Sequence, residues 1–231
     1  MARTARLILP HQPHHILQKG HNRQPFFLDD EDYLFFLKQL REASVQYNAA
    51  VHAYTLMSVR LHLLVTPDDA ASLARMMQRV GRHYVPYFNK KYNRSGALWE
   101  GRYRTSPVAA DACFLRCSCF IEWIPVWQGL VRRPADYRWS SYAHHTGARQ
   151  DPLIHDHPLY WGLGNTPFAR EAAYDRLIAV PFFSDETARI SRAFEQGWPV
   201  GPAEFVAGLE KQAGHLFRMG IKGRPPKKTT I

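Results

Sequence analysis

The chain has 231 residues, of which 45% are hydrophobic and 13% aromatic, a composition that fits a globular protein and excludes a disordered one. Its formal net charge of +10 favours a polyanionic partner, with nucleic acid first among the candidates. No apolar run approaches the roughly 18 residues of a membrane span, so we expect no membrane partner.

The first predicted elements are a strand, a helix and a pair of strands. His14–Lys19 is predicted to form the first strand. Acidic residues from Asp29 to Asp32 stand where a helix dipole favours negative charge, and apolar residues at helical spacing continue that helix to about Tyr47. Val51–Met57 and Arg60–Val65 are then predicted to be paired strands.

A second helix is predicted over Asp69–Tyr92, with a kink at Pro86. The next strand is expected at Arg102–Val108, and Asp111 opens a third helix that Pro125 ends or bends. Three shorter helices are predicted further along the chain, over Thr166–Val180, Ser184–Gln196 and Pro202–Ala213.

The order strand, helix, strand, strand, helix, strand, helix predicts an α+β fold. We expect an antiparallel-sheet sandwich of ferredoxin-like type with helices on one face, followed by a helical C-terminal extension. The polar, turn-rich stretch Ala148–Pro152 marks a boundary. The predicted division is a domain over residues 1–150, a helical extension over 151–217 and a basic tail over 218–231.

Cysteine and histidine clusters in this chain do not have the spacing of a metal site. Cys113, Cys117 and Cys119 lack the Cys-x-x-Cys spacing that zinc sites use. We therefore expect buried, reduced thiols in a cytoplasmic protein. His144 and His145 fall in a predicted loop, where solvated imidazoles are expected.

The most informative motif is Arg60-x-His62 on the predicted strand. Side chains two positions apart on a strand share one face, so a His-x-His pair can hold one divalent cation. Here Arg60 stands at the first position, and a guanidinium does not bind a cation. The motif therefore points to a lineage of metal-dependent enzymes while arguing against their chemistry in this chain.

Five segments carry a family resemblance over roughly residues 10–165, in the order and at the spacing of that family. They are Pro13–Gln24, Leu56–Leu63, Leu98–Arg104, Phe120–Val126 and Asp136–Tyr142. Together they resemble the REP-associated tyrosine transposases, an IS200-like branch of the HUH single-strand DNA endonucleases. The resemblance implies an HUH-type α+β fold in a bacterial protein.

The resemblance also implies a reaction. A tyrosine on the third helix attacks a DNA phosphate, which Mg²⁺ or Mn²⁺ polarises; a histidine pair and a polar side chain of that helix hold the metal. This chain keeps His62, but Arg60 replaces the first histidine, Phe120 the tyrosine and Ile124 the usual asparagine. Phenylalanine has no oxygen for the attack. We therefore predict weak metal binding or none, and no cleavage by the family route.

Three interpretations of these replacements stay open. The chain is a decayed transposase, a domesticated non-catalytic protein that binds hairpin DNA or RNA, or a nuclease with a different nucleophile. Our prediction is a transposase-family protein that recognises REP-type hairpin and single-stranded DNA, with DNA transposition impaired. The sequence predicts neither the target DNA sequence nor the oligomeric state.

Basic residues near the resembling segments are the predicted DNA contacts. They are Arg23, Arg60, Arg79, Arg82, Lys90, Lys91, Arg102 and Arg104. Arg60 is a special case, since its own charge can contact a phosphate where the family uses a metal. Lys222 and Arg224, in the tail segment Lys222–Lys228, resemble the core of an AT-hook, which lies in the narrow minor groove.

Overall fold

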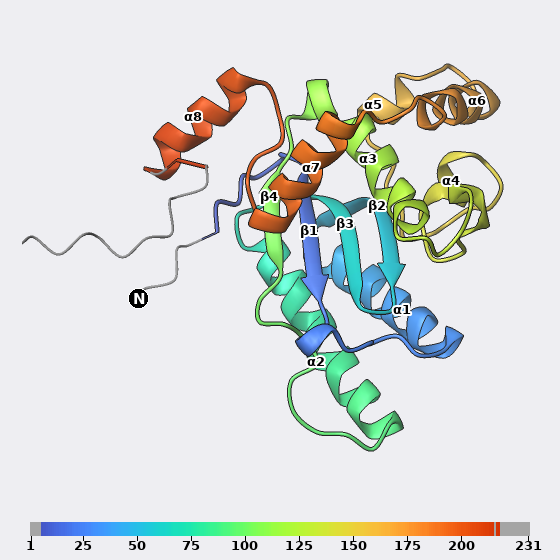
Figure 1. The fold of residues 1–231 in the computed structure, drawn as a ribbon, viewed down its shortest axis with the longest axis vertical. Coiled ribbons are helices and arrows are strands. Elements are labelled where there is room, and N and C mark those ends of the chain that lie inside the picture. Colours follow the sequence, from blue (N-terminus) through green and yellow to red (C-terminus); the bar gives the residue numbers. More distant parts are fainter. Residues whose placement is uncertain (1–5, 215, 218–231) are drawn as a thin grey trace, which may run out of the picture.

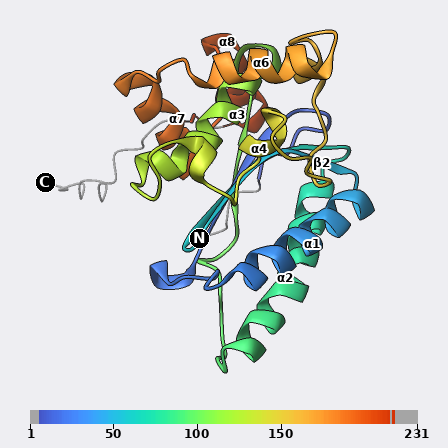
Figure 2. The same cartoon turned by 90° about the vertical axis from the view of Figure 1, so that its right-hand side faces the viewer.

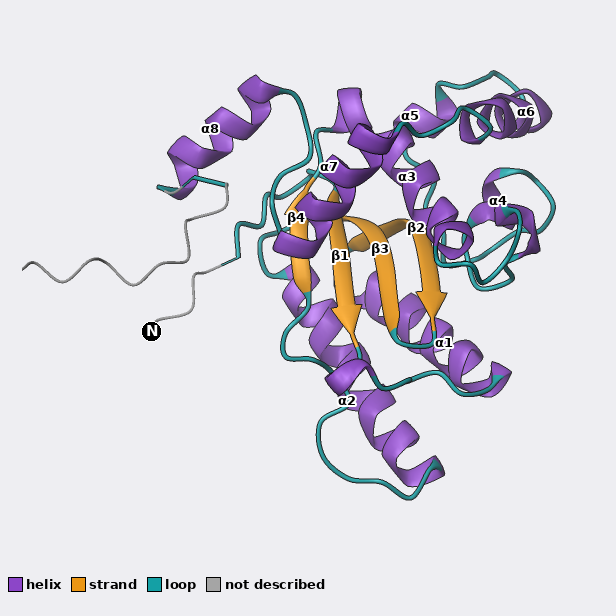
Figure 3. Cartoon of the chain, in the orientation of Figure 1, coloured by secondary structure: helices purple, strands orange, loops and turns teal. Residues whose placement is uncertain are grey.

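A four-stranded antiparallel sheet forms the centre of the computed structural model, which describes residues 6–214 and 216–217 (Figures 1 and 3). Its strands lie in the order β2-β3-β1-β4. The bounds are β1 His14–Lys19, β2 Ala49–Met57, β3 Arg60–Pro67 and β4 Arg104–Pro107. The predicted strands and the antiparallel α+β class are confirmed.

The strand register assigns side chains to two faces. Leu17 and Thr55 both lie opposite His62, which places these three residues on one face of the sheet. Ile16 and Tyr54 both lie opposite Leu63 and belong to the other face. Both faces are buried, so each needs its own covering layer.

Helices α1 (Asp30–Gln46) and α2 (Ser72–Lys91) cover the Leu63 face. The acids that predicted the start of α1 form a capping box: the Asp32 amide donates to the Asp29 side chain at 3.1 Å, and the Asp29 amide donates back at 3.4 Å. Pro86 lies inside α2.

The His62 face is covered by α3 (Ala110–Trp127) and α7 (Ser184–Gln196), which Figure 2 places on the side of the sheet away from α1 and α2. The sequence predicted helices on one face of the sheet. The structure adds a second helical layer, formed by α3 and α7, on the other face. Pro125 lies in the last turn of α3, where it removes the amide that would bond the Ile121 carbonyl. Thr55 Oγ1 donates to that carbonyl at 2.8 Å instead, and the helix runs on to Trp127. Cys117 and Cys119 are buried, and burial raises the pKa of Cys117.

The chain after α3 is helical, as predicted. Its helices are α4 (Tyr142–His145), α5 (Pro158–Trp161), α6 (Pro167–Ile178), α7 and α8 (Ala203–Ala213), with a short 3₁₀ turn at Pro134–Asp136. Another 3₁₀ turn, His21–Arg23, follows β1. Since α7 shares a hydrophobic cluster with α3, the chain beyond residue 150 contributes to the core, and the division at that residue stays a prediction. Within the described residues, the helices lack the length and apolarity needed to cross a membrane.

Candidate functional site

The motif residue His62 is buried on the α3/α7 face, at 5% exposure. Its Nδ1 lies 2.9 Å from His15 Nε2 on the neighbouring strand. Burial, with smaller contributions from the charges of Arg60 and Lys19, lowers the pKa of His62 to about 3, and burial also lowers the pKa of His15. Both imidazoles are therefore neutral at pH 7, and they are bonded to each other.

Helix α7 lies directly over this histidine pair. The Phe194 ring stacks on His15, with 3.4 Å between ring centroids and 7° between planes. Phe194 is 1% exposed, and burying such a side chain contributes about 1.5–3 kcal/mol to folding. The cover is thus an integral part of the core.

The next residue of α7, Glu195, neutralises the cations beside the histidine pair. Its carboxylate pairs with Lys19, and its Oε1 lies 3.5 Å from Arg60 Nη1. The Arg60 side chain is about one-third exposed. Because the Glu195 carboxylate already pairs with the Arg60 guanidinium, a DNA phosphate would compete with Glu195 for Arg60.

Phe120 and Ile124 of α3, which the resemblance assigns to the family's tyrosine and asparagine positions, belong to the same hydrophobic cluster as Phe194. Phe120 is 3% exposed and its ring contacts those of Trp127, Phe182 and Phe194, at centroid distances of 4.8, 5.6 and 5.5 Å. Ile124 is 6% exposed. We use "family site" below for Arg60, His62, Phe120 and Ile124, which the fold gathers between the sheet, α3 and α7.

The family site does not fit a divalent metal. His62 Nε2 is buried without a hydrogen-bond partner, so one ligand atom is present. The other two positions supply a cationic guanidinium and an aliphatic side chain. Within the described residues, no group of three or more His, Cys, Asp or Glu side chains is placed to hold a metal ion.

Besides Arg60, two more of the predicted DNA contacts are paired with acidic neighbours. Arg79 contacts Glu42 at 3.1 Å. Lys91 Nζ lies 2.8–3.1 Å from carboxylate oxygens of Asp29, Glu31 and Asp32. Acidic side chains of the protein therefore neutralise the charges of Arg79 and Lys91, and we do not count these two residues among the DNA contacts.

Five predicted DNA contacts are exposed and have no ion-pair partner among the described residues. They are Arg23, Arg82, Lys90, Arg102 and Arg104, which we call the basic set. The segments that carry Arg23 and Arg102 are joined: the Gly20 and Trp99 backbones pair, and the His21 amide donates to Leu98 O at 2.9 Å. Lys222 and Arg224 lie outside the described residues.

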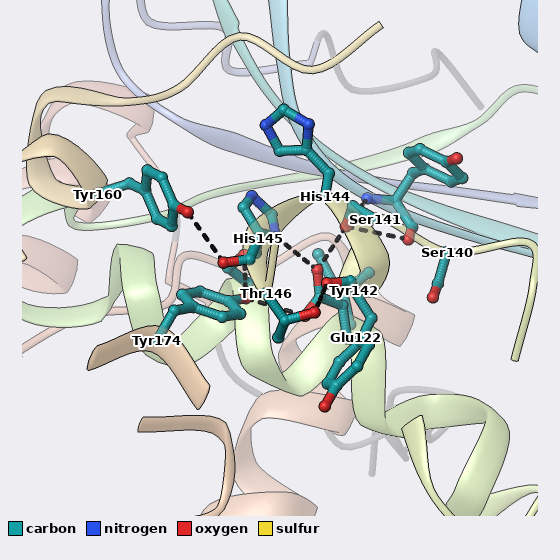
Figure 4. Close-up of polar contacts among 12 residues, drawn as sticks. Glu122, Ser140, Ser141, Tyr142, His144, His145, Thr146, Tyr160 and Tyr174 are labelled. Atoms are coloured by element: carbon teal, nitrogen blue, oxygen red, sulfur yellow. Dashed lines mark hydrogen bonds and ion pairs between the residues drawn. The ribbon is translucent and has the colours of Figure 1, made fainter. Parts of the chain in front are cut away.

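A buried polar cluster, which sequence reasoning missed, is centred on Glu122 of α3 (Figure 4). Its Oε1 accepts from Ser141 Oγ at 2.6 Å and lies 2.7 Å from His145 Nδ1, while its Oε2 accepts from Tyr174 at 2.9 Å. His145 is 4% exposed, so the expectation of a solvated imidazole was wrong. Because the carboxyl group lies between its donors and all are buried, the cluster joins α3 to α4 and α6 and offers no open nucleophile.

Comparison with known proteins agrees with this geometry. Residues 11–114 match the family model described as "Transposase IS200 like". No curated protein matches the sequence. A solved structure of the REP-associated tyrosine transposase bound to a REP hairpin is similar in fold, with 15% identity, a TM-score of 0.51, and coverage of 68% of this chain and 93% of that chain.

A second solved structure, a putative transposase from Deinococcus radiodurans R1, has 20% identity and a TM-score of 0.37, covering 47% of this chain and 87% of that chain. The family model confirms the family resemblance over Pro13–Gln24, Leu56–Leu63 and Leu98–Arg104, whereas Phe120–Val126 and Asp136–Tyr142 lie beyond the matched residues. Residues 11–114, somewhat less than half of the chain, are similar to the IS200-like transposase family.

Proposed function

We propose that this protein binds DNA hairpins and the single strands beside them, and that it does not cut them by the family's tyrosine reaction. The match of residues 11–114 to the transposase family model supports DNA as the polyanion that the net charge of +10 favours. The relative of similar fold is described as bound to a REP hairpin, which supports a hairpin as the form of that DNA.

The residues of the family site argue against cleavage by the tyrosine reaction. The position of the attacking tyrosine is Phe120, which has no oxygen and is 3% exposed. A nucleophile must reach the phosphorus atom in line with the leaving group. Phe194 fills the space between Phe120 and His15, so a DNA strand has no access to this position.

The basic set supports binding without cleavage. Five exposed cations that each neutralise one phosphate give a slope of about −4.5 for log affinity against log salt, at about −0.9 per contact. Raising the salt concentration fourfold should then weaken binding about 500-fold. This electrostatic contribution needs neither a metal nor a nucleophile.

The experiment is a salt titration of binding to a fluorescent palindromic hairpin from the DNA that flanks the gene. Arg82→Gln should make the slope less steep by about 0.9, since one phosphate contact is lost. Arg79→Gln is the matched control on the same helix: Arg79 is already paired with Glu42, so its slope should equal that of the unaltered chain.

Equal slopes for the two variants would contradict the assignment of the basic set. Absence of any salt-dependent hairpin binding would contradict the proposed function as a whole. A matched RNA hairpin that outcompetes the DNA hairpin would transfer the function to RNA.

A further inference from the structure

A cavity of about 880 Å³ lies between α1 and the chain that runs along the β2 edge of the sheet. Residues of α1 from Leu34 to Gln46 form one wall, and Arg138, Trp139 and the segment 149–152 form the other. The second wall is joined to the sheet, since the Leu56 amide donates to Trp139 O at 2.9 Å. The volume lies in the range of sites that hold small organic ligands.

Helix α1 has a second apolar side that the described residues leave uncovered. Phe36, Leu40 and Ala43 are fully buried in the core on the sheet side. Leu34 and Val45 line the cavity on the opposite side of the helix, and they are 53% and 66% exposed. A surface helix normally buries a single apolar stripe, so apolar side chains that line a cavity on the other side indicate a binding surface.

The wall opposite α1 is rigid. The Trp139 ring stacks on Tyr33, with 4.4 Å between centroids and 7° between planes. The Tyr54 hydroxyl donates to Asp151 Oδ2 at 2.6 Å, and the Leu153 amide donates to Oδ1 at 3.0 Å. Because these contacts hold the aromatic ring and the loop in place, little ordering is needed when a ligand binds.

The charge around the cavity is positive. Its lining contains four cations, which are Lys38, Arg41, Arg138 and Arg149. The two acids of the lining are already engaged: Glu42 pairs with Arg79 at 3.1 Å, and Asp151 accepts the hydrogen bonds described above. Arg138 pairs with Asp30, and the other three cations have no ion-pair partner in the described part of the chain. A ligand that suits this lining carries a negative charge.

The cations and the apolar side chains stand close together. Lys38 and Arg41 come one turn after Leu34 and one turn before Val45, respectively, on the same side of α1. Arg149 faces them from the other wall, and its charge reaches the cavity: burial and the Asp151 carboxylate raise the pKa of Tyr54, whereas Arg149 opposes that rise. One molecule can therefore meet an apolar surface and a cation at the same time.

The chain's own ends and DNA fit this cavity poorly. Residues 1–5 and 218–231 contain cations and no acid, so the positive lining would repel them. A phosphate backbone would leave the apolar wall unfilled. The cavity also lies at the β2 edge of the sheet, whereas Arg104 of the basic set is on β4 at the opposite edge.

We propose that this cavity binds a small anionic amphiphile, a carboxylic acid with an apolar chain. The apolar chain lies against Leu34, Val45 and Trp139, and the carboxylate lies between Arg41 and Arg149, which can donate charge-assisted hydrogen bonds to it. The site needs no DNA, so this inference goes beyond the proposed function.

The probe is decanoate, compared by titration calorimetry with octanoate, decanol and decyltrimethylammonium. Decanoate should bind with one molecule per chain. Each buried methylene raises affinity about fourfold, so octanoate should bind up to about fifteenfold more weakly. Decyltrimethylammonium has the same chain and the opposite charge, and it should bind more weakly by about tenfold or more, because the hydrogen bonds to the carboxylate are lost.

Two variants with matched controls locate the site. Leu34→Gln should weaken decanoate binding about tenfold, whereas Leu28→Gln, equally exposed at 53% and outside the cavity, should not change it. Arg149→Gln should weaken decanoate binding about tenfold and leave decanol binding unchanged, whereas Arg132→Gln should change neither. All four positions are exposed, so all four variants should fold.

The inference is overturned if decanoate does not bind, if decyltrimethylammonium binds as tightly, or if each variant behaves like its control. In these cases hairpin binding still stands, and so does the proposed function. A flanked hairpin, with unpaired nucleotides on each side, should not displace decanoate. Displacement would assign the cavity to DNA and would also overturn the inference.

Discussion

A tyrosine at position 120, where the resemblance expects the family's nucleophile, should destabilise this protein. Phe120→Tyr adds one hydroxyl to a ring that is 3% exposed and enclosed by Trp127, Phe182 and Phe194. Those rings offer no strong hydrogen-bond acceptor, and an unpartnered buried hydroxyl costs about 1–3 kcal/mol. At about 2–4 °C per kcal/mol for a chain of this size, Tm should fall by roughly 2–12 °C.

The assay is thermal unfolding of Phe120→Tyr beside the control Phe183→Tyr. Phe183 is 76% exposed, so the same added hydroxyl is hydrated there and stability should change by less than about 0.5 kcal/mol. A Phe120→Tyr protein as stable as the control would refute the reasoning, because its hydroxyl would have reached solvent through the cover that Phe194 forms.

Two further predictions concern buried polar groups. Glu122→Gln should cost about 2–4 kcal/mol, because an amide nitrogen replaces an acceptor that its buried donors need. Tyr174→Phe should cost less, about 1–3 kcal/mol, because it removes the contacts of one hydroxyl with Glu122 and Ser118 but leaves Ser141 and His145 on the carboxylate. Urea unfolding ranks the two variants, and a larger cost for Tyr174→Phe would contradict the central role of Glu122. Stability should also fall in acid, since burial lowers the pKa of His52 to about 3 from the ordinary 6.5. Below about pH 6.5 the unfolded chain binds a proton that the folded chain does not, so this residue removes about 1.4 kcal/mol per pH unit down to about pH 4. The slope between pH 6 and pH 4.5 should be smaller by that amount in His52→Gln, and an unchanged slope would refute the assignment.

The elements of the fold follow from local signals in the sequence. Asp29 and Asp32 mark the start of α1 because a capping box needs only residues three apart. Arg60 and His62 share a face because a strand alternates. Such signals lie within a few residues of one another, and the predicted strands and longer helices agree with the structure to within a few residues.

The cover over the family site depends on contacts that the sequence does not encode locally. Ile190, Ala193 and Phe194 give α7 an apolar stripe at helical spacing, but the stripe does not say which surface it meets. The partners of Lys91 are likewise about sixty residues earlier in the chain. Predicting either contact requires the tertiary arrangement.

The Glu122 cluster did have a sequence signal. Glu122 is the one acidic residue within the otherwise apolar stretch Phe120–Trp127, and a lone carboxyl group on a buried helix needs buried donors. Those donors, Ser141, His145 and Tyr174, lie 19–52 residues away. The acid marks a buried polar site, whereas its partners are visible only in the fold.

Covalent trapping tests the central claim most directly. The unaltered chain is incubated with a 5′- and 3′-labelled flanked hairpin and with Mg²⁺ or Mn²⁺, and products are separated on a denaturing gel while binding is measured in parallel. The account predicts full-length DNA, no protein-linked label and retained binding. A DNA–protein adduct that survives boiling in detergent, mapped to any side chain, would contradict it.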